Sequence, residues 1–129
     1  MAKRRRKPVI AEKPAVDKAT VHLTDHLDIG AFPRGVQSRV MLALVTDGLG
    51  EPIRVPVIVA RGARDGPTLG ITSALHGNEL NGIAVLHRLL ESLDLSRLRG
   101  TIVAVIVANV PGFSRRQREY AEGTDLNHV

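Results

Sequence analysis

The stretch TLGITSALHGNELNGIAVLHRLLESLDLSRLRGTIVAVIVANV, residues 68–110, carries the clearest structural pattern in the chain. Its first part, residues 68–75, is mainly apolar and predicts a strand. In residues 79–93 the apolar side chains instead recur at helical spacing, and one stripe contains Leu86, Leu89, Leu90 and Leu93. Residues 101–110 are nearly all apolar, which suits a strand buried on both faces. A strand, a helix and a strand joined in this way form a right-handed βαβ unit with parallel strands.

Two β-branched runs precede this unit and predict an antiparallel pair of strands. They are residues 36–46 and 53–61, separated by the turn-rich DGLGEP. Pro56 predicts an edge position or a bulge, because its nitrogen cannot donate to a neighbouring strand. TVHLTDHLDIG, residues 20–30, is compatible with a short helix or a loop. We therefore predict an α/β fold, with a mixed sheet around a central βαβ unit.

Composition limits the chemistry that the chain can perform. A length of 129 residues is enough for one compact domain. Apolar residues make up 43% of the chain and aromatic residues only 2%, so the core must consist mainly of Val, Ile, Leu and Ala. The absence of cysteine excludes disulfides, thiolate nucleophiles and cysteine-based zinc sites, and it leaves histidine and carboxylates as the strong metal ligands.

The positive charge of the chain is concentrated at its start. KRRRK, residues 3–7, holds five of the 18 basic residues, and the other 13 balance the 13 acidic ones. We therefore expect residues 1–20 to be a basic disordered tail and linker, and residues 21–129 to form the folded part. Because the excess charge does not lie on a face of the fold, we expect no specific nucleic-acid partner.

Hydropathy gives no indication of a membrane protein. No apolar run reaches the roughly 18 residues of a membrane-spanning helix. The segment after the basic start is interrupted by charges and proline, so it does not resemble the core of a signal peptide. We expect a cytoplasmic protein with no membrane partner, and the basic tail leaves weak contact with RNA or anionic lipid as the remaining option.

The stretch ALHGNELNG, residues 74–82, lies where a ligand site is expected. His76 directly follows the first strand of the βαβ unit and Asn109 ends the second, and ligands of open α/β sheets bind at the carboxyl ends of strands. His76 and Glu79 are both good metal ligands and can converge after a bend at Gly77. The alternative is that Asn78 caps the next helix and that the helix dipole favours Glu79 in the first turn.

Three motifs in sequence order resemble the succinylglutamate desuccinylase/aspartoacylase family. They are ALHGNELNG, VANVPGF (residues 107–113) and RQREYAEGTDLNH (residues 116–128), and the resemblance covers roughly residues 50–128. The family consists of zinc deacylases related to metallocarboxypeptidases. The resemblance implies a zinc-carboxypeptidase-like fold and one zinc ion per complete site. It also implies a small-molecule substrate, an N-acyl amino acid-like compound whose amide or ester bond is cleaved by zinc-bound water.

The same resemblance implies roles for individual residues. His76 and Glu79 match the family's first two zinc ligands. Arg118 matches an arginine that polarises the scissile carbonyl and stabilises the oxyanion, for which a permanently charged guanidinium is suited. Asn127 matches an asparagine that helps hold the carboxylate of the substrate. His128 stands where the family has arginine, and a histidine cannot make the same bidentate carboxylate contact.

Several alternatives remain open at this point. Arg115 and Arg116 could take the role of Arg118, although both are more typical of solvated loop charges. His22 and His26 are four residues apart, a spacing that can chelate a metal if the segment is helical, but they have no partner motif.

The resemblance places two further groups beyond residue 129, namely a histidine as the third zinc ligand and a glutamate as the general base. We therefore expect the chain to be the N-terminal part of a zinc deacylase-like catalytic domain, incomplete at its C-terminus. On its own it should bind zinc weakly. The remaining interpretations are a truncated or degenerate non-catalytic homologue and a carboxypeptidase-type peptidase. The sequence does not indicate an oligomeric state.

Overall fold

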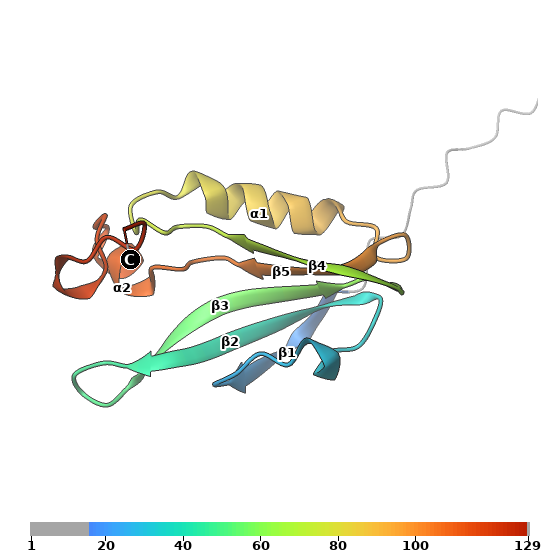
Figure 1. Cartoon of the computed structure of the whole chain (residues 1–129), viewed down its shortest axis with the longest axis horizontal. Coiled ribbons are helices and arrows are strands. Elements are labelled where there is room, and N and C mark those ends of the chain that lie inside the picture. The colour runs from blue at the N-terminus through green and yellow to red at the C-terminus, as the bar shows by residue number, and fades with distance from the viewer. Residues whose placement is uncertain (1–15, 129) are drawn as a thin grey trace, which may run out of the picture.

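The computed structural model of the chain describes residues 16–128, so residues 1–15 of the tail and linker predicted for residues 1–20 lie outside this range. Helix α1 packs along one face of a sheet, whose strand order in the described part is β1-β2-β3-β5-β4 (Figure 1). The strands are β1 (Val16–Thr24), β2 (Val36–Thr46), β3 (Pro52–Arg61), β4 (Arg64–Thr72) and β5 (Arg99–Val105). The helices are α1 (Asn81–Ser92) and α2 (Val110–Arg115), with 3-10 turns at Ile29–Ala31 and Ala121–Gly123.

The two strongest predictions are confirmed. β2 and β3 form a long antiparallel pair, and β4, α1 and β5 form the βαβ unit with parallel strands. β5 lies between β3, to which it is antiparallel, and β4, to which it is parallel. Its almost continuous apolar sequence therefore follows from its interior position in a mixed sheet.

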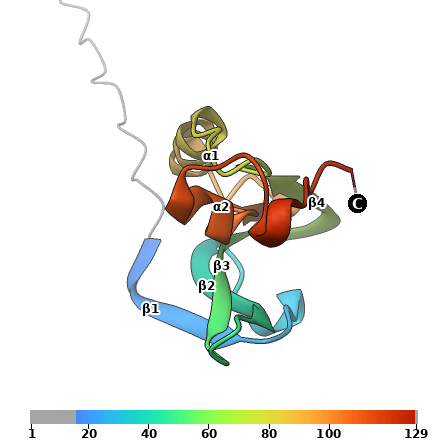
Figure 2. The same ribbon diagram turned by 90° about the vertical axis from the view of Figure 1, so that its left-hand side faces the viewer.

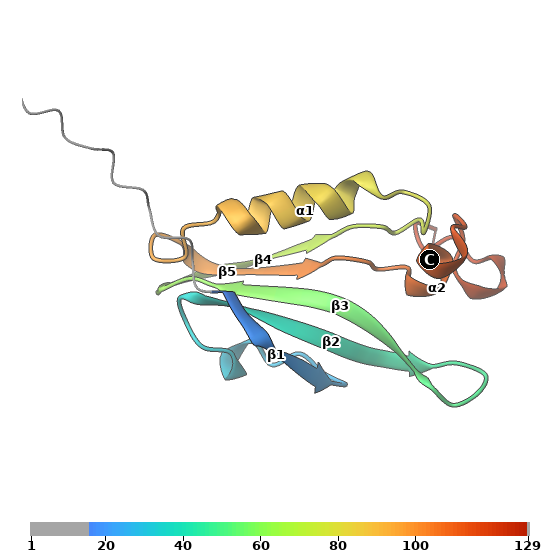
Figure 3. The ribbon, with the colours of Figure 1, turned by 180° about the vertical axis from the view of Figure 1, so that it is seen from behind.

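Two hydrophobic clusters cover opposite faces of the sheet. Alternate residues of a strand point to opposite faces, so Ala60 of β3 packs beneath α1 whereas Val57 and Val59 face the other way. The cluster beneath α1 comprises Ala60, Ala74, Leu86, Leu90, Leu95, Ile102, Ala104, Ile106 and Val107. The cluster on the opposite face comprises Phe32, Val40, Val55, Val57 and Val59, on the side where the chain turns back after β1 (Figure 3). Aliphatic residues dominate the core, as the composition predicts.

The prediction of a helix or loop for residues 20–30 is wrong for residues 20–24, which form a strand, whereas residues 25–28 are a loop. β1 extends to Thr24 and pairs in parallel with β2. A 3-10 turn follows, in which the Asp28 side chain accepts from the Gly30 amide. Residues 16–20, expected to be linker, belong to β1. The reason for the difference is that β1 is held by pairing with β2, which a local sequence pattern does not reveal.

The prediction of an edge position or bulge for Pro56 is also wrong. Pro56 lies in the interior strand β3, and the irregularity of the β2–β3 ladder lies between Ala43 and Val45. The Pro56 carbonyl accepts from the Ile106 amide at 2.9 Å, so its nitrogen faces the β5 side of the strand. Pairing with β5 ends at the next residue, Val57, so the missing donor interrupts no ladder.

β4, the strand that leads to the predicted site, occupies a different position in the sheet from the one expected. β4 forms one edge of the described sheet rather than a central strand. Its carboxyl end nevertheless lies beside that of β5, and α2 follows at the same end of the molecule (Figure 2). Among the described helices, none is long and apolar enough to cross a membrane.

Candidate metal centre

The segments that follow β4 and β5 are joined to each other by hydrogen bonds. The Ser73 amide donates to the Val105 carbonyl, and the Asn109 amide donates to the Ala74 carbonyl, both at 3.0 Å. Ala74 has a φ of 50°, an unusual left-handed conformation for a residue with a side chain. The chain turns there and directs His76 to the edge of the sheet where Asn109 lies, as predicted.

Gly77 is required for a close backbone approach, in addition to the predicted bend. A Cβ atom on Gly77 would lie 2.0 Å from the carbonyl carbon of Gly112. The Gly77 amide donates to the carbonyl of Arg118 at 3.3 Å. The loop that carries His76 is thus pressed against α2 and the segment that follows it.

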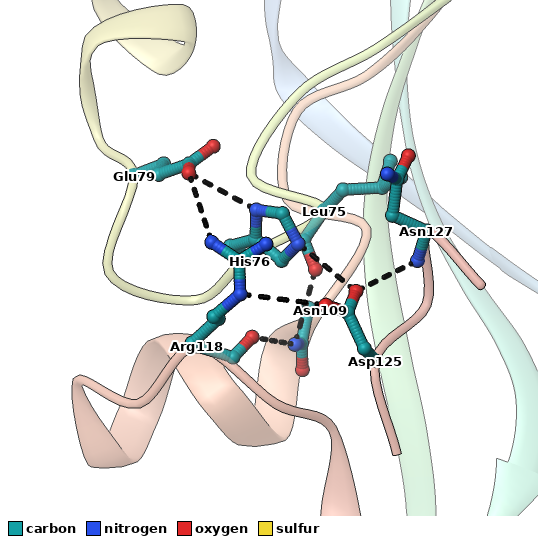
Figure 4. A network of polar contacts seen from close by, with 7 residues as sticks. All are labelled: Leu75, His76, Glu79, Asn109, Arg118, Asp125 and Asn127. Atoms are coloured by element: carbon teal, nitrogen blue, oxygen red, sulfur yellow. Dashed lines mark hydrogen bonds and ion pairs between the residues drawn. The ribbon is translucent and has the colours of Figure 1, made fainter.

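Each ring nitrogen of His76 faces one carboxylate (Figure 4). Nδ1 lies 3.0 Å from Oε1 of Glu79, and Nε2 lies 3.0 Å from Oδ1 of Asp125. The side chain of His76 is 10% exposed and that of Glu79 is 62% exposed. When the ring is protonated it donates to both carboxylates, and these two hydrogen bonds, first the one to Asp125 and then the one to Glu79, raise the pKa of the imidazole above its usual value. The ring is therefore held firmly, while Glu79 remains open to solvent.

This arrangement fits two ligand positions of a metal site. Nitrogen and oxygen ligands of one tetrahedral zinc ion lie about 3.3 Å apart, given metal–ligand bonds of about 2.0–2.1 Å. The separation of His76 Nδ1 and Glu79 Oε1 is close to that value. Metal-binding histidines commonly donate their other N–H to a carboxylate, which is the position of Asp125. Within the described residues, no group of three or more histidine and carboxylate side chains is placed to hold a metal.

Helix capping does not explain this pair. α1 begins at Asn81, and its N-cap, Leu80, makes no side-chain capping bond. Glu79 lies before the first turn, and its amide donates to the His76 carbonyl at 3.0 Å. The alternative of Asn78 as cap with Glu79 in the first turn is therefore wrong.

Asp125 is a site residue that the sequence interpretation missed. Its carboxylate accepts from His76, and Oδ1 also accepts from the Asn127 amide at 2.9 Å. The Asn127 hydrogen bond, followed by the interactions with His76 and Arg118, lowers the pKa of Asp125 to about 2. The available signal was the aspartate of the motif DLNH, two residues before Asn127.

Arg118 lies beside both carboxylates. Its Nε is 3.3 Å from Oδ2 of Asp125, and its Nη1 is 3.8 Å from Oε1 of Glu79. About half of its side chain is exposed. Arg115 and Arg116 are exposed, and within the described part of the chain neither guanidinium is hydrogen-bonded to this group. Of the three arginines, only Arg118 is placed beside the proposed ligands.

The predicted substrate-binding residues follow Asp125 directly. The amides of Asn127 and His128 donate to Asp125, at 2.9 Å to the side chain and 3.0 Å to the carbonyl, and both residues are exposed. Their backbone is fixed beside His76 while their side chains face solvent. Their role in binding a substrate stays a prediction.

The surroundings of His22 and His26 differ from those of His76. His22 lies in β1 and packs edge-on against Phe32, with ring centroids 5.3 Å apart. His26 Nδ1 lies 2.8 Å from Asp25, with both side chains exposed. The segment is not helical, so the four-residue spacing of the two histidines does not bring their rings onto one helix face.

Comparison with known proteins gives an independent result. The sequence model of one protein family, the succinylglutamate desuccinylase/aspartoacylase catalytic domain, matches residues 65–129 of this chain. No curated protein matches the chain. Among solved structures, an aspartoacylase family protein from Mesorhizobium loti is 29% identical, with a TM-score of 0.67, over 80% of this chain and 32% of that protein.

Two further solved structures share the fold. The ectoine utilization protein EutE from Ruegeria pomeroyi is 25% identical, with a TM-score of 0.57, over 66% of this chain and 27% of that protein. A candidate metallopeptidase from Shewanella amazonensis is 24% identical, with a TM-score of 0.51, over 67% of this chain and 32% of that protein. The chain thus spans about a third or less of the length of these relatives. It is a member of the succinylglutamate desuccinylase/aspartoacylase family, a family of hydrolases.

Proposed function

We propose that this chain carries the zinc-binding part of a deacylase, which hydrolyses an amide or ester bond of an N-acyl amino acid-like small molecule. The observation that supports this most is the arrangement of His76 between two carboxylates. Nδ1 faces Glu79 and Nε2 faces Asp125, each at 3.0 Å. One nitrogen is thereby directed to a metal position while the other is held by a carboxylate, as in hydrolytic metal sites.

The donor set favours zinc among the common metals. Histidine nitrogen and carboxylate oxygen, without thiolate, form the hydrolytic zinc sites of many enzymes. When bound, such an ion lowers the pKa of water toward neutrality and polarises a substrate carbonyl. His76 and Glu79 would hold the ion, and Asp125 would keep the His76 ring in place through Nε2.

Arg118 is placed to act on the substrate. Its guanidinium stays charged at any working pH and presents several N–H donors in one plane. Because it lies beside Glu79, it can donate to an oxygen that becomes negative next to the metal position. Asn127 and His128, exposed beside Asp125, would bind the amino acid part of the substrate.

The test is hydrolysis of N-acyl derivatives of glutamate and aspartate by the protein produced from its complete gene. Activity should be lost on chelation and restored by zinc. His76→Ala and Glu79→Ala should abolish it, and Arg118→Ala should reduce turnover by about 100- to 1000-fold, as for other oxyanion donors. Arg115→Ala replaces an exposed arginine at the end of α2; this variant is the matched control and should retain activity.

Two results would contradict the proposal. One is hydrolysis that survives both chelation and His76→Ala. The other is zinc-dependent cleavage of dipeptides with none of N-acyl amino acids, which would indicate a peptidase instead of a deacylase.

A further inference from the structure

The Asp125 carboxylate is held on both of its oxygens. Oδ1 accepts from His76 Nε2 and from the Asn127 amide, and Oδ2 accepts from Arg118 Nε at 3.3 Å. Asp125 is about one quarter exposed, so its orientation depends on these donors. The donor on Oδ2 is thus in a position to determine how Oδ1 is presented to His76.

The backbone of Arg118 is held in place by hydrogen bonds to its carbonyl. Its carbonyl accepts from the Gly77 amide at 3.3 Å and from Nδ2 of Asn109 at 3.2 Å. Asn109 is fully buried and also donates to the Leu75 carbonyl at 3.1 Å. The backbone on either side of His76 is therefore tied to the residue whose side chain contacts Asp125.

We propose that Arg118 is a positioning residue for His76, in addition to any contact that it makes with a substrate. Its Nε–H fixes the Asp125 carboxylate, which in turn keeps the proton of the neutral His76 ring on Nε2, so that the unprotonated Nδ1 faces the metal position beside Glu79. The inference rests on the proposed function in treating Nδ1 as the metal-binding atom.

The geometry of a guanidinium allows one residue to serve both purposes. Nε and the two Nη groups donate in fixed, divergent directions in one plane. Nε is used by Asp125, whereas Nη1 is 3.8 Å from Glu79, beyond hydrogen-bond distance. The Nη groups therefore remain available while Nε holds Asp125. A lysine has a single nitrogen and cannot reproduce this division.

The experiment measures the His76 tautomer by ¹⁵N NMR of the imidazole ring, in the metal-free chain at a pH where the ring is neutral. The chain should show the tautomer with the proton on Nε2. Arg118→Ala should give a mixture of tautomers, and Arg118→Lys should not restore the original state. Asp125→Asn is the positive control, and Arg115→Ala, an exposed arginine of the same region, is the matched negative control.

A zinc titration of the same variants gives the second measurement. Loss of residues that orient a metal ligand typically weakens metal binding by about 10- to 100-fold. For Arg118→Ala we expect zinc affinity to weaken by about 10-fold, the lower end of this range. An unchanged tautomer and an unchanged zinc affinity in Arg118→Ala would overturn the inference, as would full recovery in Arg118→Lys. If the unsubstituted chain binds no zinc at His76, the proposed function fails instead. The tautomer measurement then still tests the contact between Arg118 and Asp125.

Discussion

The buried side chain of Asn109 donates to the carbonyl of Leu75, the residue directly before His76, at 3.1 Å. The two residues are 34 positions apart in the chain. This hydrogen bond links the end of the second parallel strand to the loop that carries the proposed metal ligand. The site therefore depends on the βαβ unit for its geometry, and variants of the supporting residues should reveal this.

Replacing Asn109 by alanine should destabilise the protein. The amide of Gly112 loses its acceptor, Asn109 Oδ1, and the carbonyls of Leu75 and Arg118 lose a donor. A buried polar group left without a partner costs about 1–3 kcal/mol. Urea denaturation should show a loss of at least that size in Asn109→Ala. Asn78→Ala, at an exposed position, is the control and should change stability little. Equal stability of the two variants would contradict the proposed role of the Asn109 amide.

Gly77→Ala should also be destabilising, for a steric reason. The added methyl group would meet the Gly112 backbone at 2.0 Å, so the loop and α2 must separate. Overpacking of this kind typically costs about 1–3 kcal/mol. Gly70→Ala in β4 is the matched control, because no atom lies within 4 Å of the new methyl group. Thermal unfolding should show a lower Tm for Gly77→Ala only, and a similar Tm in both variants would mean that the loop adjusts freely.

The contact between His76 and Asp125 should make stability depend on pH in the metal-free chain. The pKa of Asp125 falls from 3.8 to about 2 on folding, so its contribution is present above pH 3.8 and is lost as the pH falls through 2. The pKa of His76 is raised above 6.5, so its contribution is complete below pH 6.5 and is lost as the pH rises through the folded value.

The stability difference between the chain and Asp125→Asn should therefore be largest between pH 3.8 and 6.5, the unfolded values of the two groups. Urea denaturation at a series of pH values measures it. A difference that does not vary with pH would show that the two side chains are not paired in solution.

His128→Arg should improve KM for N-acyl amino acids with an acidic side chain, in the protein from its complete gene. A guanidinium can make two parallel hydrogen bonds to a carboxylate, which an imidazole cannot. His26→Arg, at another exposed histidine, is the control for added charge. Loss of activity in His128→Arg would mean that the substrate does not present a carboxylate there, although the metal site could still be correct.

The sequence predicted those parts of the fold that have strong local periodicity. The leucine stripe of α1 and the apolar run of β5 each identify their element without reference to the rest of the chain. The strand β1 has no such pattern, and its structure depends on pairing with β2. Pro56 is a second case in which local sequence is not enough. A proline is tolerated at this position of β3 because the ladder with β5 ends at the next residue, Val57.

The site was predictable where its residues are close in sequence. His76 and Glu79 are three positions apart, and the HGNE motif together with the family resemblance suggested a pair of ligands. Asp125 is 49 positions from His76, and only the fold brings the two together. The predicted roles of Asn127 and His128 rest on the family resemblance, because both side chains face solvent.

The central claim is that His76 and Glu79 are ligands of one metal ion. Titration of the ¹⁵N-labelled chain with zinc, followed residue by residue by NMR, tests it most directly. We expect shifts centred on His76, Glu79 and Asp125, with weak affinity because two protein ligands do not complete a site. His76→Ala should abolish these shifts, whereas the double variant His22→Ala, His26→Ala should preserve them. Shifts centred on His22 and His26, with none at His76, would contradict the account.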